Sequence, residues 1–104
     1  MTLDDLEATI AARAKADPDS SWTARLLSKG PEKCAEKFGE EAIEAIIEVV
    51  RGDRDALTRE AADVFFHLMV MLRARGVSAA DVMAELERRQ SQSGIAEKAG
   101  RQEG

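Results

Sequence analysis

Two pairs of carboxylates interrupt the two most apolar stretches of the chain. Glu41 and Glu44 form one pair, and Glu60 and Asp63 form the other. Residues three apart lie on the same face of a helix, because a helix advances by roughly 100° per residue. From Ala61 to Leu72 the positions around the second pair are otherwise almost entirely apolar. The pattern therefore predicts two helices that each carry a narrow acidic stripe along an apolar surface.

The rest of the sequence also favours helix. Its 104 residues suffice for one small domain, aromatic residues make up only 4%, and no alternating strand pattern or hairpin turn is present. We expect a loop or short helix around Trp22 and Leu26, with both side chains packed as anchors. Helices are expected over about residues 3–16, 31–51, 54 or 56 to 75, and 79–89, where Pro, Gly, Asp and Ser supply start and stop signals.

These helices predict an all-α domain over residues 1–90 that resembles a four-helix bundle. Residues 91–104 form a polar, basic tail interrupted by glycine, which we expect to be mobile unless a ligand orders it. The helix over 54–75 is apolar on nearly every side, and so small a domain cannot bury it alone. We therefore expect a homodimer or a larger assembly built from dimers.

Charge and cysteine content narrow the class of function. The net charge of −5 argues against a nucleic-acid partner. Cys34 is the only cysteine, which fits a reducing compartment, and it is expected to be buried on a helix. No signal peptide is visible, and no apolar run approaches the roughly 20 residues that span a membrane. These features predict a cytoplasmic protein.

The acidic stripes predict a metal site. Carboxylates beside an apolar wall suffer desolvation and mutual repulsion, which a cation relieves. The short connection at Gly52 implies antiparallel helices, so the two pairs would face each other across a groove. Oxygen ligands suit Mg²⁺, with Mn²⁺ as an alternative, and Mg²⁺ keeps positions open for water and phosphate. The expected ligands are Glu41, Glu44, Glu60 and Asp63; alternatively, these residues are surface charges paired with lysine and arginine at helical spacing.

Basic residues precede the stripe. Lys29, Lys33 and Lys37 recur every four residues and would reach phosphate oxygens, or else pair with neighbouring glutamates on a solvated face. His67 would act as an acid or base, would orient a metal ligand, or is a hydrogen-bonded structural residue. Trp22 would stack on a base, although packing against the helices is the expectation.

Three stretches resemble a known family: KGPEKCAEKFGEEAIEAIIE, EAADVFFHLMVML and RRQSQSGIAEKAGR. They resemble phosphoribosyl-ATP pyrophosphatases, which belong to the all-α, MazG-like nucleoside triphosphate pyrophosphohydrolases. The resemblance covers about residues 22–101. The four carboxylates are the motif shared by the whole superfamily. The lysines, the ADVFFH segment and the SGIAEKA tail narrow the resemblance to the phosphoribosyl-ATP pyrophosphatases within it. Phe66 stands where the family usually has tyrosine, which removes a hydroxyl.

The resemblance implies a MazG-type fold and Mg²⁺-dependent hydrolysis of phosphoribosyl-ATP to phosphoribosyl-AMP and pyrophosphate, the second step of histidine biosynthesis. It places the metal on the four carboxylates and the phosphates on the three lysines. A nearby glutamate, Glu40 or Glu48, would help to deprotonate the attacking water. In the tail, Lys98 and Arg101 would close over the ligand as that segment orders.

Three other functions are compatible with the sequence. A related enzyme that cleaves ordinary or damaged nucleoside triphosphates would share the fold, the metal and the bond cleaved. A di-iron helical bundle would require two Glu-x-x-His pairs, whereas His67 lies four residues after Asp63. A non-catalytic dimeric helical partner protein would carry the acidic stripes as mere surface.

Overall fold

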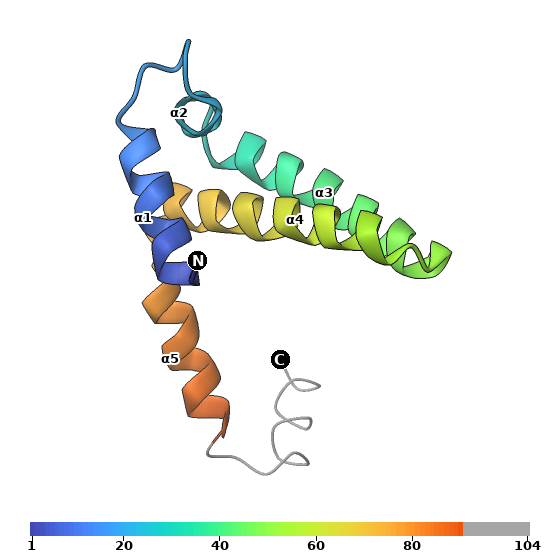
Figure 1. Ribbon diagram of the computed structural model, residues 1–104. Coiled ribbons are helices and arrows are strands. Elements are labelled where there is room, and N and C mark those ends of the chain that lie inside the picture. Colours follow the sequence, from blue (N-terminus) through green and yellow to red (C-terminus); the bar gives the residue numbers. More distant parts are fainter. Residues whose placement is uncertain (91–104) are drawn as a thin grey trace.

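The computed structural model describes residues 1–90, and it contains helices but no strand in this range (Figure 1). The prediction of an all-α domain is therefore confirmed. The predictions for the tail, including Lys98 and Arg101, lie outside the described residues. The helices are α1 (Leu3–Ala14), α2 (Trp22–Ser28), α3 (Pro31–Arg51), α4 (Arg54–Ala74) and α5 (Ala79–Gln90).

The helix boundaries follow the start and stop signals in the sequence. The segment around Trp22 and Leu26, for which a loop or a short helix was expected, forms the short helix α2. Pro31 opens α3 after Gly30, where it loses no intrahelical hydrogen bond. Gly52 ends α3 with a φ of 78°, in the left-handed region that favours glycine. The Asp53 side chain then accepts a hydrogen bond from the backbone N–H of Ala56 (3.0 Å) and caps α4.

These adjacent caps leave a two-residue connection between α3 and α4. The two helices consequently run antiparallel and side by side, as predicted, and form a long hairpin that extends away from the other helices (Figure 1). This hairpin carries all the residues of the acidic stripes.

The core lies at the base of the hairpin, where all five helices contribute. Its buried hydrophobic side chains include Ile10, Leu26, Cys34, Met69 and Val70. Burial of Leu26 and Cys34 confirms two predictions. The prediction that Trp22 packs as an anchor is wrong: 44% of its surface is exposed, because the buried face of the short helix α2 is filled by Thr23, Ala24 and Leu26.

A long-range hydrogen bond joins the first helix to the last. The Glu7 carboxylate accepts a hydrogen bond from the backbone N–H of Ala79, at 2.7 Å, across 72 positions of sequence. Ser78 and Asp81 complete the start of α5, because each side chain accepts a hydrogen bond from the other's backbone N–H. The orientation of α5 against α1 is thus fixed by a polar contact as well as by packing.

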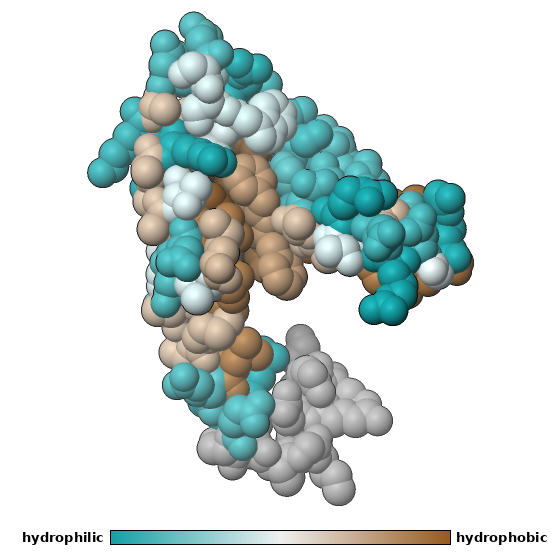
Figure 2. Space-filling view, viewed as in Figure 1, coloured by the Kyte–Doolittle hydropathy of each residue, from teal (hydrophilic) through white to brown (hydrophobic). Residues whose placement is uncertain are grey.

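Apolar surface remains exposed on the hairpin and on α5. Phe65 of α4 is 55% exposed, so a single chain leaves part of this apolar helix uncovered. Figure 2 shows hydrophobic surface where the hairpin meets α1 and again near the free end of the hairpin. None of the described helices is long and apolar enough to cross a membrane. The exposed apolar side chains of α3 and α5 are Ile43, Ile46, Ile47, Val49, Val50, Met83 and Leu86.

Candidate metal and nucleotide site

The two carboxylate pairs meet across the hairpin. Glu41 and Glu44 project from α3, and Glu60 and Asp63 project from α4. Carboxylate oxygens of Glu41, Glu60 and Asp63 all lie within 4.8 Å of one another. Glu44 also belongs to the cluster, because its carboxyl group interacts with those of Glu41 and Glu60. The antiparallel hairpin thus brings together all four residues that the sequence proposed.

Burial and charge repulsion both act on this cluster. Burial raises the pKa of Glu41, and the charge of Glu44 raises it further. Burial likewise raises the pKa of Glu60. A hydrogen bond with Glu44 and the charge of Glu44 raise the pKa of Glu60 further. One oxygen of Glu60 is shielded from solvent and has no hydrogen-bond partner in the described part of the chain. A buried acceptor without a donor, among like charges, is suited to a cation.

Glu40 and Glu48, the two candidate bases, have different surroundings. Glu40 accepts a hydrogen bond from Lys37 at 2.8 Å, and this contact lowers the pKa of its carboxyl group. Glu48 lies one turn beyond Glu44, with one oxygen 3.4 Å from Arg51. Its second oxygen is buried and has no partner among residues 1–90. Glu48 therefore keeps a free acceptor next to the cluster, whereas Glu40 is occupied.

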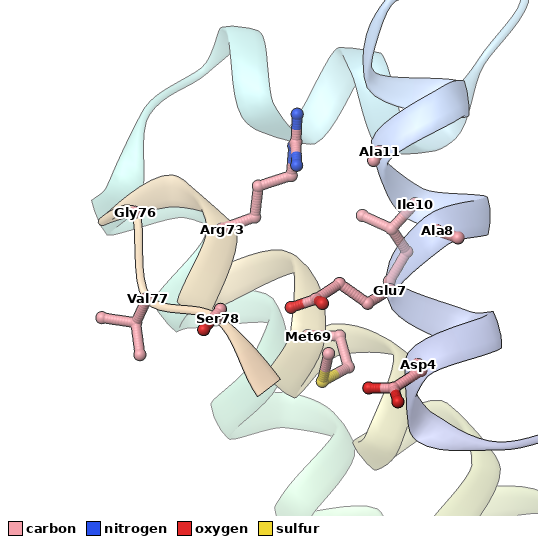
Figure 3. A pocket seen from close by; sticks show the side chains of 10 residues that line it. All are labelled: Asp4, Glu7, Ala8, Ile10, Ala11, Met69, Arg73, Gly76, Val77 and Ser78. Carbon is pink, nitrogen blue, oxygen red and sulfur yellow. The ribbon is translucent and has the colours of Figure 1, made fainter. Parts of the chain in front are cut away.

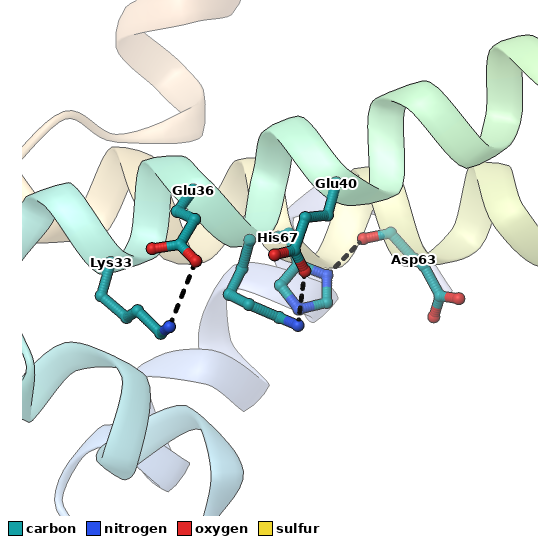
Figure 4. A network of polar contacts seen from close by, with 6 residues as sticks. Lys33, Glu36, Glu40, Asp63 and His67 are labelled. Carbon is teal, nitrogen blue, oxygen red and sulfur yellow. Dashed lines mark hydrogen bonds and ion pairs between the residues drawn. The ribbon is translucent and has the colours of Figure 1, made fainter.

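The lysines pair with glutamates on the solvated side of α3, as one reading of the sequence proposed (Figure 4). Lys33 lies 3.3 Å from Glu36, and Lys37 lies 2.8 Å from Glu40. Lys29 caps the end of α2 instead, and Gly30, with a φ of 97°, breaks the helical repeat between Lys29 and Lys33. Only Lys33 and Lys37 thus share one helix face.

His67 is 7% exposed and lies next to the cluster without belonging to it (Figure 4). Its Nδ1 lies 2.8 Å from the backbone oxygen of Asp63, while its Nε2 is buried and has no partner within residues 1–90. The Phe66 ring meets the imidazole edge-on, with 5.0 Å between ring centroids. This geometry favours the hydrogen-bonded structural role over the other two readings. An all-carboxylate cluster also disfavours a di-iron site.

An open cavity lies away from this cluster (Figure 3). Its volume is about 590 Å³, and it opens between α1 and the connection from α4 to α5. Glu7 and Arg73 line it, but none of the four clustered carboxylates does.

Together, the fold and the site define an all-helical protein whose clustered carboxylates are presented by an antiparallel helix pair. The family model described as phosphoribosyl-ATP pyrophosphohydrolase matches residues 3–90. The chain belongs to this family, which confirms the resemblance seen in the sequence.

Curated relatives named phosphoribosyl-ATP pyrophosphatase match nearly the whole chain. The relative from Roseobacter denitrificans is 75% identical, over 97% of this chain and 96% of its own length. The one from Dinoroseobacter shibae is 75% identical, over 92% of this chain and 94% of its own length. A relative from Cereibacter sphaeroides is 73% identical, over 95% and 96% respectively.

Proposed function

We propose that this protein hydrolyses phosphoribosyl-ATP to phosphoribosyl-AMP and pyrophosphate, and so catalyses the second step of histidine biosynthesis. The observation that carries this proposal is the match to relatives of that name, 75% identical over 97% of the chain. The clustered carboxylates of α3 and α4 support it, because they suit a reaction at a phosphate chain. A biosynthetic role of this kind also fits the cytoplasm.

Mg²⁺, or Mn²⁺ in its place, fits the cluster. The donors are all carboxylate oxygens, and the partnerless buried oxygen of Glu60 lies among them. Glu41, Glu44, Glu60 and Asp63 would hold the metal. When bound, such an ion neutralises phosphate oxygens and stabilises charge on the leaving pyrophosphate. The protein therefore supplies its carboxylates at fixed positions on a rigid hairpin, rather than a covalent nucleophile.

Lys33 and Lys37 would bind the phosphate chain. Both amino groups pair with glutamates at the surface, at 3.3 and 2.8 Å. Surface ion pairs of this kind contribute about 0–1 kcal/mol, so exchanging a carboxylate for a phosphate oxygen costs little. Lys29 would approach from the end of α2, and Lys98 and Arg101 from the tail.

Water activation falls to Glu48 or Glu40. Glu48 has the stronger case, because one of its oxygens is buried and accepts no hydrogen bond among the described residues. Glu40 would first have to release Lys37, which holds its pKa below the ordinary value. Displacement of Lys37 by a phosphate group would free Glu40, so both residues stay candidates.

The protein would act as a homodimer or a dimer-based oligomer. Ile43, Ile46 and Val50 are 59, 61 and 82% exposed, and their spacing places them on one stripe of α3. Such an apolar stripe is typical of an interface between helices. Two hairpins packed along it would form a four-helix bundle of the MazG type.

The test is pyrophosphate release by the purified protein from phosphoribosyl-ATP and from a panel of (deoxy)nucleoside triphosphates, with Mg²⁺ or with a chelator. We expect release that requires Mg²⁺ and is confined to phosphoribosyl-ATP. Release mainly from the other nucleotides would support the same metal site but would assign the protein to nucleotide housekeeping instead of histidine biosynthesis. No release from any substrate, by folded protein with Mg²⁺ present, would overturn the proposal.

A further inference from the structure

An open cavity borders the hairpin near the lysines. Its volume is about 380 Å³, within the range of roughly 300–1,000 Å³ that is typical of small-molecule sites. Two aromatic side chains line it, Trp22 from α2 and Phe66 from α4. Within residues 1–90, the remaining lining consists of small and hydroxyl side chains together with a single charged residue, Arg13. Aromatic walls with a few polar groups suit a flat ring that bears polar substituents.

Trp22 is held firmly yet left uncovered. Ser21 caps α2 by accepting a hydrogen bond from the backbone N–H of Ala24 (3.1 Å), and its hydroxyl donates one to the backbone oxygen of Arg13 (3.1 Å). Thr23 and Ala24, which follow Trp22, are buried, whereas Trp22 itself is 44% exposed. A large aromatic surface on a fixed backbone loses little conformational entropy when a ring stacks on it.

This cavity adjoins the acidic cluster through both helices of the hairpin. Phe66 follows Asp63 by three residues on α4, and Lys37 precedes Glu41 by four on α3, which correspond to about 4.5 and 6 Å along a helix axis. Lys37 also contacts the aromatic wall, with its Nζ 5.8 Å from the centre of the Trp22 ring. Lys37 thus stands between the cavity and the carboxylates.

We propose that the cavity between Trp22 and Phe66 binds the adenine ring of the nucleotide, with Trp22 as the stacking surface. This inference rests on the proposed function. In the substrate a single ribose separates the adenine from the phosphate that is attacked, so the base must lie close to the carboxylates. Lys37 occupies the intervening position, where the phosphate chain would leave the sugar.

Arg13 extends the proposal to substrate choice. Within the part of the chain that the structure describes, its guanidinium makes no hydrogen bond or ion pair, and it lies at the cavity wall. Phosphoribosyl-ATP differs from ATP by a second ribose phosphate attached to the adenine. A base in this cavity would direct that extra phosphate toward Arg13, because Arg13 is the one charged residue among residues 1–90 that lines the wall.

The inference can be tested without catalysis, because Trp22 is the only tryptophan of the chain. Its intrinsic fluorescence should be quenched saturably by AMP in the presence of Mg²⁺, but not by ribose 5-phosphate or pyrophosphate. Equal quenching by pyrophosphate and AMP would overturn the proposal. The absence of quenching at concentrations of AMP that saturate the enzyme would overturn it as well. If AMP quenches but phosphoribosyl-ATP is not cleaved, the base site stands and the proposed function fails.

Kinetics provide the second measurement. Trp22→Ala should raise KM for phosphoribosyl-ATP about tenfold or more, with a smaller change in kcat, since base stacking contributes about 1–3 kcal/mol. Trp22→Phe should recover most of the affinity, and Met83→Ala, an exposed apolar position outside this cavity, should change neither constant. Arg13→Ala should weaken binding of phosphoribosyl-ATP but not of AMP. An active Trp22→Ala variant with unchanged KM would contradict the assignment.

Discussion

The Nδ1 atom of His67 lies 2.8 Å from the backbone oxygen of Asp63, one turn earlier on α4. Because a carbonyl oxygen only accepts hydrogen bonds, Nδ1 carries the proton and Nε2 is the open position in the neutral ring. Burial leaves that nitrogen without a partner among residues 1–90. The imidazole therefore supports the helix turn that presents Asp63, and no contact with the other carboxylates is needed for this role.

Replacing His67 by asparagine should leave the fold intact and lower turnover by less than about tenfold, because the asparagine amide can still donate to the Asp63 oxygen. His67→Ala removes this donor and leaves a cavity, so it should lower the free energy of unfolding by about 1–3 kcal/mol. Chemical denaturation and steady-state kinetics measure the two effects. If His67→Asn were inactive while His67→Gln were active, the group at Nε2 would be acting on the substrate instead.

Glu44→Ala and Asp63→Ala should each lower turnover by about 100-fold or more while helix content stays unchanged, because each removes a proposed metal ligand. Circular dichroism and pyrophosphate release measure the two properties. Glu87→Ala, an exposed position on α5, is the matched control and should behave as the parent protein. Full activity of both cluster variants in Mg²⁺ would show that the metal assignment is wrong.

Without metal, the protein should become more stable as the pH falls from about 7 toward about 5. Burial and neighbouring carboxyls raise the pKa of Glu41 and Glu60 above their ordinary value of 4.5. Such groups hold a proton more tightly in the folded chain. Their contribution is thus present below 4.5 and is lost as the pH rises through the folded-state pKa.

Thermal unfolding in a chelator at several pH values tests this dependence. Glu85 has the opposite effect on the pH dependence of stability, because hydrogen bonds from Arg88 and Arg89 lower its pKa to about 2. Its contribution to stability is present above its ordinary pKa of 4.5 and is lost only as the pH falls below that value. A double variant, Glu41→Gln with Glu60→Gln, should show a flatter profile between about pH 5 and 7. A melting temperature that fell on acidification across that interval would refute the interpretation.

Substitution by alanine should have opposite effects on stability at Gly39, within α3, and at Gly52, which caps the end of that helix. Gly52 has a φ of 78°, so Gly52→Ala should destabilise the protein by about 1–2 kcal/mol. Gly39 is helical, and beyond its own helix turn an added Cβ would meet no atom of residues 1–90 within 4 Å, so Gly39→Ala should stabilise the protein by about 0.5–1 kcal/mol. Urea denaturation of both variants gives the comparison. Equal effects of the two substitutions would argue against the left-handed cap.

Ile46→Lys should convert the proposed dimer to monomer, because it places a charge in the middle of the exposed stripe of α3, where Ile46 is 61% exposed. Sedimentation at several protein concentrations measures the change in mass. Ala12→Lys, which places the same charge at an exposed position on α1 and away from the stripe, is the control and should keep the parent mass. A parent protein that sediments as a monomer would refute this prediction.

Local signals allowed the hairpin and its cluster to be predicted from sequence. Gly52 and Asp53 mark a tight connection, and a spacing of three fixes the face on which each carboxylate lies. Exposure of Trp22 could not be foreseen, because nothing in the sequence says which side of a seven-residue helix faces the core. The contact between Glu7 and Ala79 was equally hidden, since it joins residues 72 positions apart.

The hairpin also bears on the order of events during folding. Its carboxylates lie on two consecutive helices joined by two residues, so the charged cluster forms through contacts that are local in sequence. Contacts of this kind close short loops and tend to form fast. Repulsion among the carboxylates therefore arises early in folding, before α5 forms its contact with Glu7. Divalent cations present during refolding would remove that repulsion at the stage when the nucleus forms.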